Sequence, residues 1–341
     1  MRPVSEDFTW VDSERLIRFG EGVAADAPAL LAERGFNDFA LLTTERAEAA
    51  APGLRDAADS VVHVPPGQVP DVAASVRDAA GGHPLVALGG GRVVDAAKAI
   101  AAADGLPCAA LPTTLSGAEL TRIHRLPAGV TGVPLVRPSL VIADPALMAS
   151  QPMPDLAATA MNALAHAVEA LYVPGRNPVA EMAALGGAGL IARGFEGEDP
   201  GRGDLALGAT LSGWALGATG YAVHHVVCQT LVRVAGTPHA ETNAIVLPHV
   251  IAMMATRAPD VIGLLAEALG AGERDPAMAA GACAALTRRA GPVSLAEVGA
   301  DEAALDAVAE AALARAELGN TPDPPGLEEL RGLLQRAYER P

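Results

Sequence analysis

The distribution of apolar segments along the chain constrains its fold most strongly. Within the first 150 residues, short apolar runs alternate with segments whose apolar residues recur at helical spacing. Such alternation is typical of a parallel sheet that helices cover on both faces. The runs that predict buried strands are 39–44, 60–64, 84–88, 108–112 and 140–144, and the helical segments between them are 24–34, 70–80 and 93–103.

The second half of the sequence has a different pattern. Long Ala- and Leu-rich stretches follow Pro154, and none of them has the pattern of a strand. They predict helices at 156–172, 178–193, 205–218, 244–256, 259–269 and 276–290. With 341 residues, the chain is long enough for two domains. We therefore expect an α/β domain with a Rossmann-like parallel sheet at 1–153 and an all-α domain at 154–341.

The charge and the cysteine content exclude several classes of protein. The net charge is −16, and such a surface repels nucleic acid and anionic membranes. No apolar run reaches the roughly 18 residues expected of a membrane span, and the N-terminus lacks the apolar segment of a signal peptide. Three widely spaced cysteines fit reduced thiols better than a disulfide framework. We expect a cytoplasmic protein with no nucleic-acid or membrane partner.

Three consecutive glycines stand between an expected strand and an expected helix. Gly89, Gly90 and Gly91 have no side chains that would keep a ligand away from their backbone N–H groups. The helix start adds unpaired N–H groups and the positive end of a dipole, which suit a dinucleotide pyrophosphate. Asp95 and Lys98, the only lysine, share a helix face and are candidates to contact ribose and phosphate. The alternative is an ordinary strand-to-helix turn with a surface ion pair. The segment is not a G-x-G-x-x-G fingerprint, which disfavours a typical Rossmann dinucleotide site.

A second polar loop follows the strand expected at 108–112. Loops past the carboxyl ends of parallel strands bind ligands in many α/β proteins. The hydroxyl groups of this loop could therefore bond the amide and phosphate groups of a cofactor. The alternative is a turn and a helix cap, which Ser and Thr also favour. The hydroxyl residues in question are Thr113, Thr114, Ser116 and Thr121.

Several histidines have a spacing that predicts a shared polar site. His166 lies four residues after Asn162, so both side chains face one side of a helix. His224 and His225 stand near the start of another apolar helix, and His239 follows a Thr-Pro turn. Three imidazoles and a carboxylate would hold Zn²⁺ or Fe²⁺, but Asn162 is neutral and supplies no compensating charge. The alternative for each histidine is a hydrogen-bonded structural role.

These segments together resemble the iron-containing alcohol dehydrogenase superfamily, which includes glycerol dehydrogenase and dehydroquinate synthase, and most closely its maleylacetate reductase branch. The resemblance runs over nearly the whole chain, and the His-His…Cys and Pro-His-Ala-Glu elements are specific to the reductase branch. The matching segments begin at Arg18-Phe-Gly-Glu-Gly, continue through 89–98, 111–121, 162–172, 224–229 and 238–249, and end at Gly319-Asn-Thr-Pro and the closing Leu/Glu-rich helix.

The resemblance implies a nucleotide-binding α/β domain, a helical domain and a cleft between them. It implies an NADH- or NADPH-dependent homodimer that reduces a small unsaturated or oxo carboxylic acid. Metal-dependent members bind the ion through an Asp and three His, which match Asn162, His166, His225 and His239 here. Members of the reductase branch tend to carry Asn at the first position without a clear need for a metal, so we expect a degenerate site without bound metal.

One departure from the family concerns the proton donor. Four residues after the second histidine ligand, the family usually has another His beside the nicotinamide, and this chain has Gln229. A glutamine can orient groups but cannot transfer a proton. We expect the catalytic set to be His166, His224, His225, Gln229 and His239, with His224, Cys228 or a water as proton donor. Two alternatives remain: lyase- or cyclase-like chemistry without net redox, and a non-catalytic homologue.

Substrate binding could also involve basic residues of the first domain. Arg122, Arg125 or Arg137 would suit a clamp for the substrate carboxylate. Exposed salt bridges are the alternative for these arginines. Glu45, shortly after the first expected strand, could hold a ribose diol and so favours NADH over NADPH.

Overall fold

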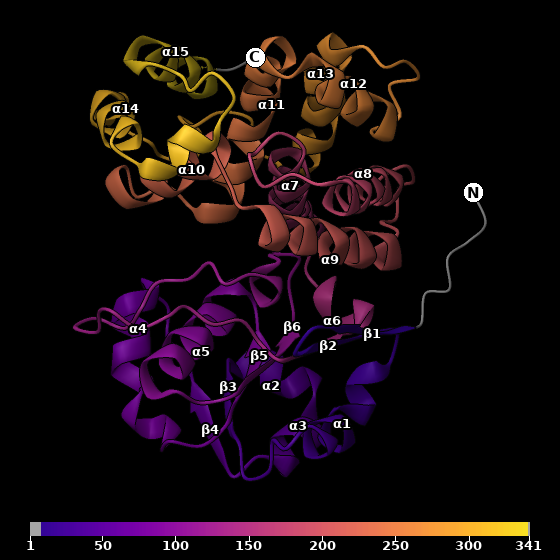
Figure 1. Ribbon diagram of the computed structural model, residues 1–341, viewed down its shortest axis with the longest axis vertical. Helices are drawn as coiled ribbons and strands as arrows, with labels where there is room; N and C mark the ends of the chain where they lie inside the picture. The colour runs from indigo at the N-terminus through magenta and orange to yellow at the C-terminus, as the bar shows by residue number, and fades with distance from the viewer. Residues whose placement is uncertain (1–7, 340–341) are drawn as a thin grey trace. The chain divides into compact units, whose positions relative to one another are not determined.

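The computed structural model describes residues 8–339 and divides the chain into two compact units, Met1–Ser150 and Gln151–Pro341. Unit 1 contains a seven-stranded sheet in the order β1-β2-β7-β6-β5-β3-β4 (Figure 1). Only β1 runs antiparallel to its neighbour, and the other pairs are parallel. The strands are β1 (Phe8–Asp12), β2 (Arg15–Phe19), β3 (Ala40–Thr43), β4 (Ser60–His63), β5 (Leu85–Gly89), β6 (Cys108–Pro112) and β7 (Leu140–Ala143).

Helices cover both faces of this sheet, as Figure 1 shows. Successive residues of β3 enter opposite cores: Leu42 packs with α4 and α5, whereas Leu41 packs with α1 and α3. Strands β3, β5, β6 and β7 are buried along their whole length, which explains their continuous apolar runs. The helices are α1 (Ala27–Glu33), α2 (Glu45–Ala50), α3 (Pro52–Ala57), α4 (Val69–Val76), α5 (Gly91–Asp104) and α6 (Pro145–Met148).

Unit 2 consists of helices and their connecting loops, with no strand among its described residues. Helix α7 is buried along most of its length and packs against α8, α9 and α11. Its helices are α7 (Met153–Ala170), α8 (Pro178–Arg193), α9 (Arg202–Thr219), α10 (Val223–Val234), α11 (His239–Arg257), α12 (Pro259–Ala268), α13 (Pro276–Thr287), α14 (Leu305–Leu313) and α15 (Leu327–Tyr338). None of the helices in the described part of the chain is both long and apolar enough to cross a membrane.

The predicted fold class, a parallel α/β sheet followed by a helical part, is confirmed. All five expected strands are present, whereas the β1–β2 hairpin was not predicted. The helix expected at 276–290 ends at Thr287 and is followed by a single 3₁₀ turn, Arg288–Ala290. Polar caps fix several helix starts: Asn177 accepts from the Ala180 N–H at α8, and Asp275 accepts from the Ala277 N–H at α13.

Candidate active site

The histidine cluster of unit 2 begins on the buried helix α7. Asn162 and His166 lie one turn apart, 5% exposed each, and Asn162 Nδ2 is 3.5 Å from His166 Nε2. The ring of His166 stacks on that of His225 from α10, with centroids 4.9 Å apart. The His224 ring meets His225 edge to face at 5.0 Å. The structure therefore brings together the three buried imidazoles that the sequence assigned to one site.

A buried carboxylate, Glu169, holds the start of α10. It lies three residues after His166 on α7 and is fully buried. Its Oε1 accepts hydrogen bonds from the backbone N–H groups of His224 (2.8 Å) and His225 (3.3 Å). These two N–H groups belong to the first turn of α10. N–H groups in the first turn of a helix find no acceptor within that helix. An anionic group there also interacts favourably with the helix dipole.

The same carboxylate sets the orientation of the His225 ring. Glu169 Oε2 lies 2.5 Å from His225 Nδ1. Because both oxygens of Glu169 face N–H groups, we assign the Nδ1 proton of His225 as the donor of this contact. His225 Nε2 is then an unprotonated nitrogen, buried and without a hydrogen-bond partner among residues 8–339. Glu169 lies within the matching segment 162–172, but no role was predicted for it from the sequence.

Burial keeps the imidazoles neutral. It lowers the pKa of His225 to about 3, with a further lowering by the nearby charge of His239. Burial likewise lowers the pKa of His224 to about 3 and that of His166 well below its usual range. The same loss of solvation raises the pKa of Glu169 to about 7. The Glu169–His225 contact is therefore a hydrogen bond from a neutral ring, although its geometry also meets the distance criterion of a salt bridge.

His224 and Cys228, two candidate proton donors, are bound to protein groups. His224 Nε2 lies 3.2 Å from the carbonyl oxygen of Asn243 on α11, and Cys228 Sγ lies 3.5 Å from the same nitrogen. Burial raises the pKa of the Cys228 thiol well above its usual value. The His224 contacts tie α10 to α11, and a buried, neutral thiol is a poor acid near pH 7.

The two remaining predicted residues lie at the edge of the cluster. His239 is the first residue of α11 and is exposed. Its charge contributes, after burial, to the lowered pKa values of His166 and His225. Gln229 lies one turn after His225 on α10, and its Oε1 accepts a hydrogen bond of 3.1 Å from Arg315.

In unit 1 the triple-glycine turn packs against the second polar loop. Gly90 is the N-cap of α5 and Gly91 is its first residue, and neither has a positive φ. A Cβ on Gly90 would lie 2.9 Å from Thr114 Cγ2, and one on Gly91 would lie 3.0 Å from Ser116 Oγ. These glycines therefore permit close approach of the two loops rather than an unusual backbone conformation. Thr114 Oγ1 is buried and has no hydrogen-bond partner among the residues described.

Lys98 is buried beneath that loop. Its Nζ donates to the carbonyl oxygens of Ala118 (2.7 Å), Thr121 (3.2 Å) and Ile123 (3.1 Å) and pairs with Asp95 Oδ1 at 2.8 Å. The amine therefore holds the end of the polar loop against α5. The Thr121 hydroxyl caps the same bend by accepting from the Ile123 N–H at 3.2 Å.

Two of the three arginines considered as a carboxylate clamp are engaged in surface ion pairs. Arg122 contacts Glu14 Oε1 at 3.4 Å, and Arg137 contacts the same oxygen at 3.0 Å and Asp12 Oδ2 at 3.5 Å. Glu14 is half exposed. Arg122 and Arg137 thus form exposed salt bridges, which was the alternative to a substrate clamp.

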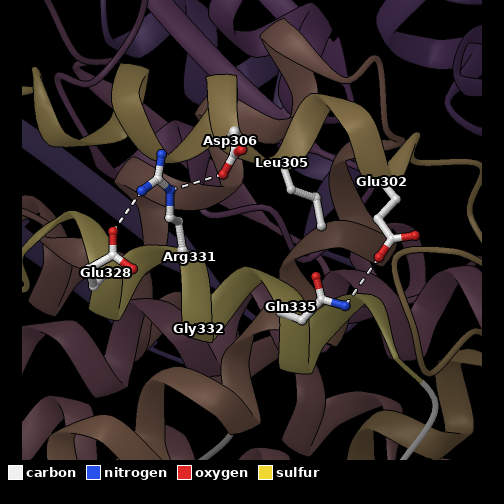
Figure 2. A pocket seen from close by; sticks show the side chains of 7 residues that line it. All are labelled: Glu302, Leu305, Asp306, Glu328, Arg331, Gly332 and Gln335. Atoms are coloured by element: carbon white, nitrogen blue, oxygen red, sulfur yellow. Dashed lines mark hydrogen bonds and ion pairs between the residues drawn. The ribbon is translucent and has the colours of Figure 1, made fainter.

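A surface pocket between α14 and α15 contains none of the predicted site residues (Figure 2). Its basic residue, Arg331, pairs with Asp306 Oδ1 at 2.9 Å and Glu328 Oε1 at 2.6 Å. Gln335 donates to Glu302 at 3.3 Å. Exposed ion pairs of this kind contribute little to the stability of a protein. A substitution in this pocket is therefore a suitable control for variants elsewhere in the unit.

Comparisons with known proteins match both parts of the chain. The family model of the Fe-containing alcohol dehydrogenase C-terminal region covers residues 156–338, and that of iron-containing alcohol dehydrogenase covers residues 18–152. Maleylacetate reductase 1 of Rhodococcus opacus is 38% identical over 80% of this chain and 78% of its own. Maleylacetate reductase of Rhizobium sp. strain MTP-10005 is 34% identical over 98% of both chains. The crystal structure of maleylacetate reductase from Agrobacterium tumefaciens superposes with a TM-score of 0.83, at 32% identity over 100% of both chains.

Proposed function

Because the chain belongs to the iron-containing alcohol dehydrogenase family and is an NAD(P)H-dependent reductase, we propose that it reduces a small unsaturated oxo carboxylic acid of the maleylacetate type. The observation that carries this proposal is the 34% identity to a maleylacetate reductase over 98% of both chains. The buried cluster of neutral imidazoles supports it, because such a site can bind a carboxylate and a carbonyl oxygen through directed hydrogen bonds.

For the coenzyme, we assign the glycine turn and the loop beside it. The first N–H groups of α5 and the unpaired Thr114 hydroxyl suit the pyrophosphate. Gly89, Thr113 and Ser116 border the same place, since the Thr113 N–H donates to the Gly89 carbonyl and a Cβ on Gly91 would lie 3.0 Å from Ser116 Oγ. Lys98 and Asp95 would act on the coenzyme through the loop that they hold. The coenzyme supplies the hydride, and NADH is the first choice for assay because Glu45 begins α2 directly after β3.

The Glu169–His225 pair is our choice for the proton source. At a separation of 2.5 Å, one proton can lie on Glu169 Oε2 or on His225 Nδ1. When Glu169 is itself protonated on Oε2, the neutral ring of His225 carries a second proton on Nε2. Donation of the Nε2 proton to the substrate is then balanced by transfer of the Oε2 proton to Nδ1, which leaves a Glu169 carboxylate and a neutral ring protonated on Nδ1. The raised pKa of Glu169, about 7, keeps that proton available near neutral pH. The Glu169–His225 pair thus supplies the proton donor, a role that the side chain of Gln229 cannot fill. His166 and His239 would help to bind the substrate.

A resident metal fits these residues poorly. The family's iron would need a charged ligand, and Asn162 is neutral. Glu169, His224 and His225 have ligand atoms within 4.8 Å of one another and form the group best placed for an ion. Their nearest atoms, however, already bond one another, Asn243 or backbone N–H groups. We therefore propose that turnover proceeds without a metal.

Two further proposals concern the setting of the enzyme. We infer a homodimer from the family resemblance and a reducing compartment, the cytoplasm, from three free and buried cysteines. The partner that we propose is a small carboxylate substrate, and the net charge of −16 argues against nucleic acid.

Maleylacetate is expected to drive stoichiometric oxidation of NADH by the purified protein. The measurement follows absorbance of the reduced coenzyme and quantifies the product by chromatography, with related oxo acids and NADPH in parallel. Product formation without net NADH consumption would instead support the lyase- or cyclase-like alternative that Gln229 suggests. Failure of NAD(P)H to raise the melting temperature, together with no turnover, would support a non-catalytic homologue.

Removal of metal is expected to leave this activity unchanged. The enzyme would be treated with a chelator, analysed for metal content and assayed before and after addition of Fe²⁺ or Zn²⁺. Because no negatively charged ligand is free at the site, neither treatment should alter kcat. Loss of activity on chelation and recovery with Fe²⁺ would show that Glu169 or the imidazoles bind the ion after all.

A further inference from the structure

A network of polar contacts around Arg315 adjoins the imidazole cluster. Arg315 Nη2 donates to Gln229 Oε1 (3.1 Å), to the Tyr221 hydroxyl (3.0 Å) and to Glu317 Oε1 (3.1 Å). Its Nε donates to Glu317 Oε2 at 3.0 Å. The Tyr221 hydroxyl donates in turn to Glu317 Oε1 at 2.8 Å. Four side chains from two distant segments thus hold one another in fixed orientations.

This network is attached to the start of α10. Asn320 Nδ2 donates to the carbonyl oxygen of Tyr221 at 2.9 Å, and the Val223 N–H donates to Thr321 Oγ1 at 3.2 Å. The ring of Tyr221 lies 5.9 Å from that of His225. The orientation of Arg315 is therefore fixed relative to His225.

Two hydrogen-bond donors of the network remain open. Since Gln229 Oε1 accepts from Arg315, its amide nitrogen is left as a donor, and no acceptor for it occurs among residues 8–339. The Nη1 group of Arg315 likewise has no protein acceptor in that range, and the side chain is 17% exposed. Gln229 lies four residues after His225, so both side chains project from one side of α10.

We propose that the Gln229 amide and Arg315 Nη1 form an anchor for a second carboxylate of the substrate, which makes the enzyme selective for dicarboxylates. This inference rests on the proposed function, because it requires that one end of the substrate binds at His225. The open N–H groups of an amide and a guanidinium side by side suit the two oxygens of a carboxylate.

The charges around the anchor are consistent with this assignment. Glu317 is the nearest carboxylate, and both of its oxygens are engaged by Arg315 and Tyr221. Its pKa is lowered to about 2, mainly by the hydrogen bond from Arg315, so it stays ionised. Burial raises the pKa of Tyr221 to about 12, so its hydroxyl stays protonated. The substrate anion is therefore held by directed N–H groups rather than by net positive charge.

The anchor also gives a reason for glutamine at position 229. An imidazole in this place would titrate near neutral pH, whereas the amide donates at every pH. Arg315 turns the amide so that its N–H groups face outward.

Binding of two non-reducible acids tests the anchor. Adipate, a dicarboxylate, and hexanoate, a monocarboxylate of the same length, would be titrated by calorimetry into the NAD⁺-bound enzyme. We expect adipate to bind about 10- to 100-fold more tightly, the effect of a charge-assisted hydrogen bond. Equal affinities would overturn the anchor. Because these ligands need no turnover, this result stands apart from the NADH assay with maleylacetate, which tests the proposed function.

Two variants locate the effect. Gln229→Glu keeps the acceptor for Arg315 but replaces the open amide nitrogen by a carboxylate oxygen, and Arg315→Met removes the guanidinium. Each is expected to abolish the preference for adipate while hexanoate affinity is retained. The matched control is Arg331→Met in the pocket of Figure 2, which should keep the preference. Equal losses for both acids, or weaker binding of NADH instead of adipate, would overturn the proposal.

Discussion

Replacement of Glu169 by Gln is expected to lower kcat by about 10²- to 10⁴-fold, the range found when the carboxylate behind a functional imidazole is lost. An amide in place of the carboxylate cannot accept the Nδ1 proton of His225 on one oxygen and the backbone N–H groups on the other, as Glu169 does. It also cannot store the proton that the reduced substrate must receive. The variant keeps the size of the side chain, so the packing of α7 is preserved.

The measurement for Glu169→Gln is steady-state kcat with maleylacetate and NADH, beside the thermal unfolding curve. Asp155→Asn is the control, because Asp155 is an exposed carboxylate in the first turn of the same helix. It should leave kcat unchanged. In a double-mutant cycle, Glu169→Gln should cause almost no further loss of kcat in the His225→Ala background, because Glu169 acts through His225. Additive losses would mean that Glu169 has a role independent of that ring.

Much of the fold follows from local pattern. Strands such as Leu85–Gly89 are buried on both faces, and their unbroken apolar runs distinguish them from the helices between them. The β2 strand was missed although its burial alternates along Arg15–Phe19. Its stability comes from pairing with β7, whose residues lie more than a hundred positions later. Periodicity contains no information about such a partner.

The same limit separates the predicted parts of the site from those that were missed. Asn162 and His166 could be paired because their spacing fixes a common helix face. Glu169 could not be paired with His225, which lies 56 residues away, nor Gln229 with Arg315, 86 residues away. Helical spacing identifies which residues share a face, but it does not show which carboxylate is buried against which imidazole.

For Lys98 the sequence predicted a place near the coenzyme site, but it did not predict the contacts that the amine makes. The sequence placed it beside a phosphate, and its position next to the glycine turn was the reason. In the structure its amine is fully buried and surrounded by three carbonyl oxygens and Asp95. A lysine in that position stabilises the loop that carries Thr114 and Ser116, whether or not a coenzyme is present.

Lys98→Met is accordingly expected to destabilise the protein by about 3 kcal/mol, because the buried amine bonds three carbonyl oxygens as well as the partly exposed carboxylate of Asp95. The methionine matches the stem in length but leaves Asp95 and the three carbonyl oxygens without their donor. Denaturant unfolding without coenzyme measures the loss. Arg77→Met is the control, because Arg77 pairs with Asp104 at the exposed end of the same helix α5 and should leave the midpoint nearly unchanged. If Lys98 acted only on the coenzyme phosphate, the variant would instead unfold like the parent protein and bind NADH more weakly.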